Sequence, residues 1–269
     1  FLDNGCTLGR LRVKNGGGRK EALRGQSPSM RLFEKTNVRS KKRTYLSWRT
    51  QVLVMPERLT ARALLLLKSI HSNGLGNWVY TRALAQLAKV STSTASTECR
   101  RFAKQGILMQ KVEGREKSYK LNLSNPRARK LSELFETEKR EKFYQSNKRL
   151  SWALQDFAKR VFDFLPQVQS VILFGSAARG EMTKTSDVDL LVIVPTMKQE
   201  EFNELMKSVD KLTAGTRGTY GFALSAVTMT MKDFESAVRE RKRIAEDVLR
   251  EGIVLFGEER YYQLLSRLV

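Results

Sequence analysis

The chain has 269 residues, enough for one large domain or two ordinary ones, and a formal charge of +21 at pH 7. This excess of Lys and Arg favours a polyanionic partner, above all nucleic acid, and no apolar run is long enough for a transmembrane helix, so we expect no membrane partner. The two cysteines, Cys6 and Cys99, exclude a disulfide framework and favour a cytoplasmic protein.

The first fifth of the chain is strongly basic. Residues 1–54 hold 13 Lys or Arg and three acidic residues, and therefore carry +10 of the net +21. They show no sustained apolar period, so we expect a disordered basic arm that contacts phosphates without sequence preference. An alternative stays open: the chain does not begin with Met, and a start at Met30 or Met55 would leave part of this arm outside the true gene product.

Residues 58–125 contain three segments of helical periodicity followed by two of strand periodicity. Thr60 can accept the first free N–H groups of the first helix, Ser91 or Thr92 those of the third, and Gly106 can end the third. The predicted helices cover 60–72, 80–89 and 91–105, and the predicted strands cover 107–112 and 118–123.

Three helices followed by a hairpin resemble a winged helix-turn-helix domain, in which the third helix lies in the major groove and the hairpin touches the backbone. The resemblance implies duplex DNA as a partner and is compatible with a homodimer. Such domains also serve as protein-interaction modules, so that alternative stays open. The buried stripe of the third helix would be Ala95, Cys99 and Phe102. The expected DNA contacts are Ser93, Thr94, Thr97, Arg100, Arg101, Lys104 and, at the hairpin tip, Arg115.

The rest of the chain predicts an α+β arrangement. Residues 126–150 predict a helical connector, and His71, at the end of the first helix, is expected near the carbonyl pole of that helix. From residue 151 onward helices and strands interleave, as in a small mixed sheet covered by helices. The predicted strands are 170–174, 188–194 and 221–231, and the apolar segment 252–257 closes the domain. The predicted helices are 176–180, 199–212, 232–240, 243–251 and 258–268.

One stretch of this second half carries chemistry. The apolar run 171–174 ends in Gly175 and Ser176, and Asp187 and Asp189 stand at the head of the next apolar run. Residues two apart in a strand point the same way, so both carboxylates face one side and repel each other unless a divalent cation lies between them. A Gly-Ser turn that opens a helix offers free N–H groups to a phosphate. The combination predicts phosphoryl or nucleotidyl transfer.

Gly-Ser, ten residues, then Asp-x-Asp resembles the signature of the nucleotidyltransferase superfamily that includes DNA polymerase beta and the minimal nucleotidyltransferases. The resemblance implies that residues 151–269 form a nucleotidyltransferase domain. It would be an enzyme that uses Mg²⁺, with Mn²⁺ as the alternative, to move a nucleoside monophosphate from ATP or another NTP to a protein or nucleic-acid hydroxyl. The implied catalytic residues and metal ligands are Asp187 and Asp189, and the implied nucleotide-binding residues are Gly175, Ser176, Arg179 and Ser186.

The chain departs from the superfamily pattern at the third carboxylate, which usually lies on the strand after Asp-x-Asp. The strand at 222–231 contains no acid, and alignment places Ser225 at that position. Asp233 and Glu235 follow the strand and are expected to begin the next helix. Two-metal transfer needs the third acid, so the ion that activates the nucleophile would be weakly bound.

The layout over residues 58–265 resembles a prokaryotic, largely archaeal, set of fused proteins in which the third acid is often missing. Some minimal nucleotidyltransferases act as antitoxins that adenylylate a partner toxin. A second hypothesis is therefore a non-catalytic DNA-binding regulator, or an antitoxin, that uses its transferase domain to bind a nucleotide or a partner protein.

Overall fold

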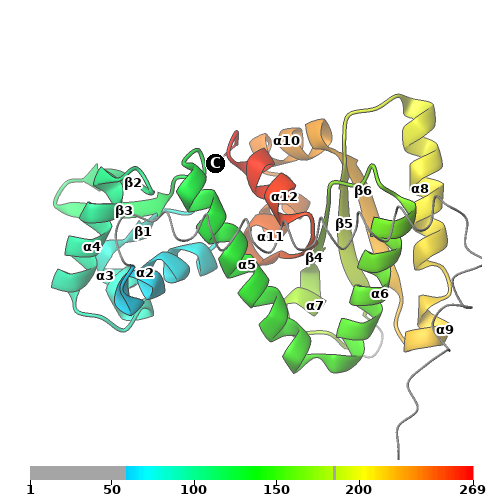
Figure 1. Ribbon diagram of the computed structural model, residues 1–269, viewed down its shortest axis with the longest axis horizontal. Helices are drawn as coiled ribbons and strands as arrows, with labels where there is room; N and C mark the ends of the chain where they lie inside the picture. Colours follow the sequence, from blue (N-terminus) through cyan, green and yellow to red (C-terminus); the bar gives the residue numbers. More distant parts are fainter. Residues whose placement is uncertain (1–58, 184–185, 269) are drawn as a thin grey trace, which may run out of the picture. The chain divides into compact units, whose positions relative to one another are not determined.

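The computed structural model describes residues 59–183 and 186–268, which Figure 1 colours along the chain. The predicted basic arm at 1–54 lies outside these described residues. Within them, no helix combines the length and the apolar composition that crossing a membrane requires.

Residues 59–123 hold three helices and a three-stranded antiparallel sheet of order β1-β3-β2. The predicted N-caps are confirmed: Thr60 Oγ1 accepts a hydrogen bond from Ala63 N (3.2 Å), and Ser91 Oγ accepts one from Thr94 N (3.1 Å). Strand β1 was not predicted, because two residues are too few to show a period. The elements are α2 (Ala61–Ser72), β1 (Val79–Tyr80), α3 (Thr81–Leu87), α4 (Thr92–Lys104), β2 (Leu108–Glu113) and β3 (Glu116–Leu121).

The predicted connector is a long helix, α5 (Pro126–Ser146), which is followed after one residue by α6 (Lys148–Phe164). Proline opens α5, where its missing N–H costs nothing. Helix α5 does more than join the two halves, because it packs along β7 and α12 at the end of the chain. Lys139 Nζ, for example, donates to the carbonyl of Gly252 at 2.6 Å.

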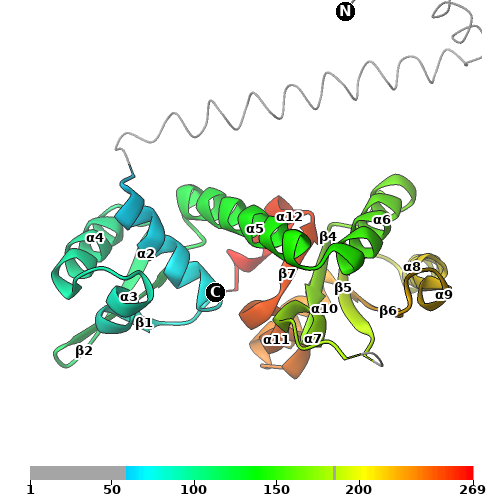
Figure 2. The same cartoon turned by 90° about the horizontal axis from the view of Figure 1, so that it is seen from below.

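The second half is built on a mixed four-stranded sheet of order β6-β5-β4-β7. Strand β4 is antiparallel to β5 and to β7, whereas β5 and β6 are parallel. Side chains of α6 and α8 form the core on one face of the sheet, and Figure 2 shows α10 and α11 on the other face. The strands are β4 (Ser170–Phe174), β5 (Val188–Val194), β6 (Leu224–Thr230) and β7 (Ile253–Phe256); the helices are α7 (Gly175–Arg179), α8 (Gln199–Thr213), α9 (Thr216–Tyr220), α10 (Met231–Arg239), α11 (Arg243–Glu251) and α12 (Glu258–Leu265).

The predicted α+β arrangement with a small, helix-covered mixed sheet is confirmed for this half. The bounds of β4, β5 and α11 agree with those predicted. Helix α9 was not predicted, and the strand expected from 221 begins only at Leu224. The reason is that the polar segment from Gly215 to Gly221 has no apolar period that would distinguish a short helix from a turn.

A buried polar network joins α2, α5 and α12. His71 lies in the last turn of α2, as predicted, but its side chain is buried, with Nε2 2.8 Å from the Tyr262 hydroxyl. That hydroxyl donates to Glu136 Oε2 (3.0 Å), and the amide of Val254 donates to Glu136 Oε1 (2.8 Å). Burial lowers the pKa of His71 to about 3, so the imidazole is neutral, and burial raises the pKa of Glu136.

Candidate functional site

The two halves of the sequence motif meet where β4 ends and β5 begins. In the antiparallel pairing of these strands, Phe174 is the register partner of Asp189. Gly175, the first residue of α7, follows Phe174 directly, so the start of this helix lies beside the carboxylates. Asp187 precedes β5 by one residue, two positions from Asp189.

Gly175 is in close contact with the Asp189 side chain. Its φ is +73°, in the left-handed region, and a Cβ built on it would lie 2.5 Å from Asp189 Oδ2. A residue with a side chain would therefore meet both backbone strain and a clash with the carboxylate. Ser176, the second residue of α7, is half-buried. The glycine of the motif is explained by a contact that the sequence alone could not show.

The two carboxylates sit in different environments. Asp189 is partly buried, and burial, followed by the negative charge of Asp187, raises its pKa, while Arg179 has the opposite effect. Asp187 is exposed on 48% of its side chain, and its Oδ1 accepts a hydrogen bond from Arg217 Nη2 at 2.7 Å. Arg217 comes from α9 and was not among the predicted site residues, because an exposed arginine in a polar segment shows no pattern that selects it.

Two further residues predicted to bind nucleotide already have protein partners. The Arg179 guanidinium donates to Glu181 Oε2 (2.6 Å) and to Glu251 Oε1 on α11. Ser186 Oγ accepts from the amide of Thr183 (3.1 Å) and lies 2.7 Å from its hydroxyl. Ser186 is thus already bonded to Thr183, and an anion near Arg179 would share that guanidinium with two carboxylates.

The neighbouring strand supplies no third acid. Asp189 is the register partner of Ser225 in the parallel pairing of β5 and β6, as the sequence alignment predicted. Across residues 59–183 and 186–268, no three Asp, Glu, His or Cys side chains are grouped so that they could hold a metal ion. Two carboxylate groups fit one hard cation such as Mg²⁺, provided that other oxygens, for example those of a triphosphate, complete its coordination.

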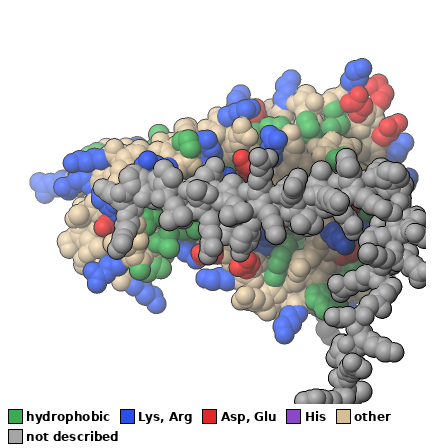
Figure 3. Space-filling view, viewed as in Figure 1, with side chains coloured by type: hydrophobic (Ala, Val, Ile, Leu, Met, Phe, Trp, Pro, Cys, Tyr) green, Lys and Arg blue, Asp and Glu red, His purple; other side chains and the backbone are tan. Residues whose placement is uncertain are grey.

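The residues predicted to contact DNA are divided by the structure into two groups. Ser93, Thr97, Arg100 and Lys104 are exposed on α4 and spaced four, three and four apart, which places them on one face. Arg115 is exposed at the tip of the hairpin formed by β2 and β3, and Figure 3 shows Lys and Arg side chains at the left edge of the view, where α4 and this hairpin lie.

The other two predicted DNA contacts, Thr94 and Arg101, have partners on their own helix. The Thr94 hydroxyl lies 2.8 Å from Ser91 Oγ at the cap of α4. The Arg101 guanidinium donates to Glu98 Oε2 (2.6 and 3.0 Å) and lies over the Phe102 ring, 4.6 Å from its centroid. The predicted buried stripe of Ala95, Cys99 and Phe102 is confirmed, and burial raises the pKa of the Cys99 thiol to about 12.

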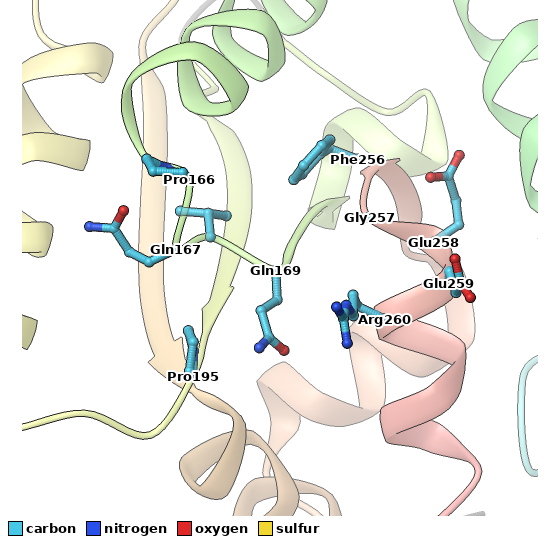
Figure 4. Close-up of a pocket in the computed structure, with 10 residues that line it drawn as sticks. Pro166, Gln167, Gln169, Pro195, Phe256, Gly257, Glu258, Glu259 and Arg260 are labelled. Atoms are coloured by element: carbon cyan, nitrogen blue, oxygen red, sulfur yellow. The ribbon is translucent and has the colours of Figure 1, made fainter. Parts of the chain in front are cut away.

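A surface pocket lies at the other end of the sheet. Figure 4 shows its labelled residues, which come from the loop before β4, from Pro195 after β5, from the end of β7 and from the start of α12. The carboxylates lie where β4 ends, whereas this pocket includes Gln169, just before β4 begins. The pocket is therefore separate from the candidate site.

Comparisons with known proteins bear on the second half of the chain. A search of curated proteins found no match. One similar solved structure is described as the crystal structure of the toxin-antitoxin with AMP-PNP; its identity is 17%, over 42% of this chain and 83% of that chain, with a TM-score of 0.28. Residues 154–255, which include the whole carboxylate site, match the family model of the nucleotidyltransferase domain.

Proposed function

We propose that the site at Asp187 and Asp189 binds a nucleoside triphosphate together with Mg²⁺ and transfers the nucleoside monophosphate to a hydroxyl group. The observation that carries this proposal is the contact between the two halves of the motif: the Asp189 carboxylate lies against Gly175, the first residue of α7. The proposal is supported because two carboxylates, a type of ligand that suits a hard cation, lie beside a helix start that suits a phosphate.

Each residue of the site has a role that its surroundings support. Asp187 and Asp189 would hold the ion, which when bound would neutralise charge on the phosphates. The N-cap of helix α7, Phe174, makes no side-chain hydrogen bond to the first N–H groups of the helix, so these remain able to bind phosphate oxygens. Gly175 and Ser176 would provide that turn, and Arg179 would add positive charge at the end of the helix.

The acid-free strand β6 favours a second candidate, in which the domain binds a nucleotide without turning it over. Ser225 stands beside Asp189, where a third carboxylate would bind the ion that activates an attacking hydroxyl. Without it, one ion can be held with the triphosphate and the second is weakly bound. In that case the domain would act as a nucleotide sensor or as a binding surface for a partner protein.

We propose that residues 58–125 form a winged helix-turn-helix domain that binds duplex DNA. The exposed face of α4 carries Ser93, Thr97, Arg100 and Lys104, hydroxyl and basic side chains suited to bases and phosphates. The high positive charge of the chain supports the same partner. The proposal of an acceptor protein or a partner toxin is supported by the sequence resemblance alone.

Transfer is tested by incubating the full chain with ATP labelled in the α-phosphate, Mg²⁺ and candidate acceptors. Label should appear on an acceptor with the native chain and be lost in Asp187→Ala and Asp189→Ala. Binding of the labelled nucleotide without transfer would select the non-catalytic candidate. Labelling that survives both substitutions would show that the transfer takes place at another site.

A further inference from the structure

Arg217 is held at the candidate site by helix α9, which is anchored at both ends. Helix α9, which carries it, precedes β6, and the first residue of β6, Leu224, is the register partner of Val188. Helix α9 therefore lies at the end of the sheet that bears the carboxylates. The buried Thr216 anchors it, because its hydroxyl donates to the carbonyl of Thr213 (2.9 Å) and accepts from the amide of Leu224 (3.0 Å).

The other end of α9 is also held. The Tyr220 hydroxyl donates to Asp156 Oδ2 on α6 at 3.2 Å, and its ring stacks on Phe222 with centroids 6.2 Å apart. Between these two anchors, the Arg217 side chain reaches Asp187, thirty residues earlier in the chain, with Nη2 2.7 Å from Oδ1. The anchors fix the helix, whereas the guanidinium itself is 60% exposed and free to change partner.

The charged side chains around the site differ in the partners that they already have. Asp187 and Asp189 are two carboxylates on one side of a strand start, and Arg179 is already bonded to Glu181 and Glu251. Arg217, in contrast, contacts Asp187 of the acidic pair. A divalent ion that bound to Asp187 Oδ1 would meet the guanidinium, and the two positive groups would compete for one carboxylate.

We propose that Arg217 is a nucleotide-binding residue that rests on Asp187 until a metal-bound triphosphate displaces it, and then binds a phosphate oxygen. This inference rests on the proposed function of the site. A guanidinium matches phosphate geometry with two parallel N–H donors. Leaving an exposed ion pair costs it little free energy. The arrangement makes the site bind free metal poorly and metal with triphosphate well.

The proposal predicts opposite effects of one substitution on two ligands. Arg217→Ala should bind free Mn²⁺ up to about fivefold more tightly than the native chain, because an exposed ion pair that competes with the ion has been removed. The same variant should bind a non-hydrolysable ATP analogue with Mn²⁺ roughly 10- to 100-fold more weakly, because it lacks a charged donor to phosphate. Both affinities follow from free Mn²⁺ measured by electron paramagnetic resonance and from calorimetry of the full chain.

A matched control is Arg243→Ala, which removes another arginine, 95% exposed and paired with Asp247 rather than with Asp187 or Asp189. It should change neither affinity. An Arg217→Ala variant that binds Mn²⁺ no more tightly, or the analogue no more weakly, overturns the proposal. A different result would contradict the proposed function itself: the native chain would not bind the analogue, or the Asp189→Asn variant would bind it as well as the native chain does.

Discussion

Replacing Gly175 by Ala should damage the candidate site much more than the fold. Its φ of +73° puts a side chain in the left-handed region, which costs about 1–2 kcal/mol of the free energy of unfolding. The free energy of unfolding of a typical domain is about 5–15 kcal/mol, so the variant should remain folded. The added Cβ would also lie 2.5 Å from Asp189 Oδ2, where ordinary contact begins at 3.4 Å. The carboxylate must therefore move by about 1 Å, a misplacement that can cost about 100-fold in site function.

The same helix offers a matched control. Gly180, just after α7, has a φ of +74°, and a Cβ built there would meet nothing within 4 Å. Gly180→Ala should therefore lose the same 1–2 kcal/mol, measured by urea denaturation, but keep the affinity for Mn²⁺ with a non-hydrolysable ATP analogue, measured by calorimetry. The reasoning is refuted if both variants lose binding equally, or if Gly175→Ala binds as the native chain does.

Three further predictions concern other parts of the molecule. Burial lowers the pKa of His71 from 6.5 to about 3, so as the pH falls the unfolded chain binds a proton at His71 before the folded chain does. Below pH 6.5 the free energy of unfolding of the native chain should therefore fall by about 1.4 kcal/mol per pH unit relative to that of His71→Gln. Parallel curves of stability against pH between pH 7 and 4.5 would contradict this. Duplex DNA binding, measured by fluorescence anisotropy, should be weaker in both Arg100→Ala and Lys104→Ala. Each substitution should also lower the slope of log K against log salt by about one, and an unchanged slope would show that these residues do not contact the DNA. Ser225→Asp should tighten Mn²⁺ binding in the presence of nucleotide, because it places a third carboxylate beside Asp189; weaker binding would argue against the two-carboxylate interpretation.

Local signals in the sequence were enough to predict much of the second half. Strands β4 and β5 are mainly apolar runs that lie next to Gly175 and Asp187, so their bounds could be predicted. The placement of Ser225 beside Asp189 was also predicted, but from alignment with the superfamily pattern, and the register of β5 and β6 agrees with it. Apolar runs and turn residues therefore place the acidic pair at the start of a strand, whereas its relation to Ser225 came from the resemblance.

The contacts that tune the site could not be predicted in this way. Arg217 reaches Asp187 across thirty residues from a polar segment without periodicity, and an exposed arginine carries no pattern that reveals its partner. The contact between His71 and Tyr262 spans 191 residues and depends on how α2 packs against the end of the chain. Long-range pairs of polar side chains of this kind depend on tertiary packing, which one sequence does not encode in a local period.

The central claim is that Asp187 and Asp189 form a metal-dependent nucleotide site. The most direct test is calorimetric titration of the full chain with a non-hydrolysable ATP analogue, with and without Mg²⁺, in the native chain and in Asp187→Asn and Asp189→Asn. Asp233→Asn, which changes a carboxylate at the start of α10, is the control. We predict binding that needs Mg²⁺, that is lost in both site variants and that is kept in Asp233→Asn. Equal affinity in the native chain and both site variants, or binding indifferent to Mg²⁺, would contradict the claim.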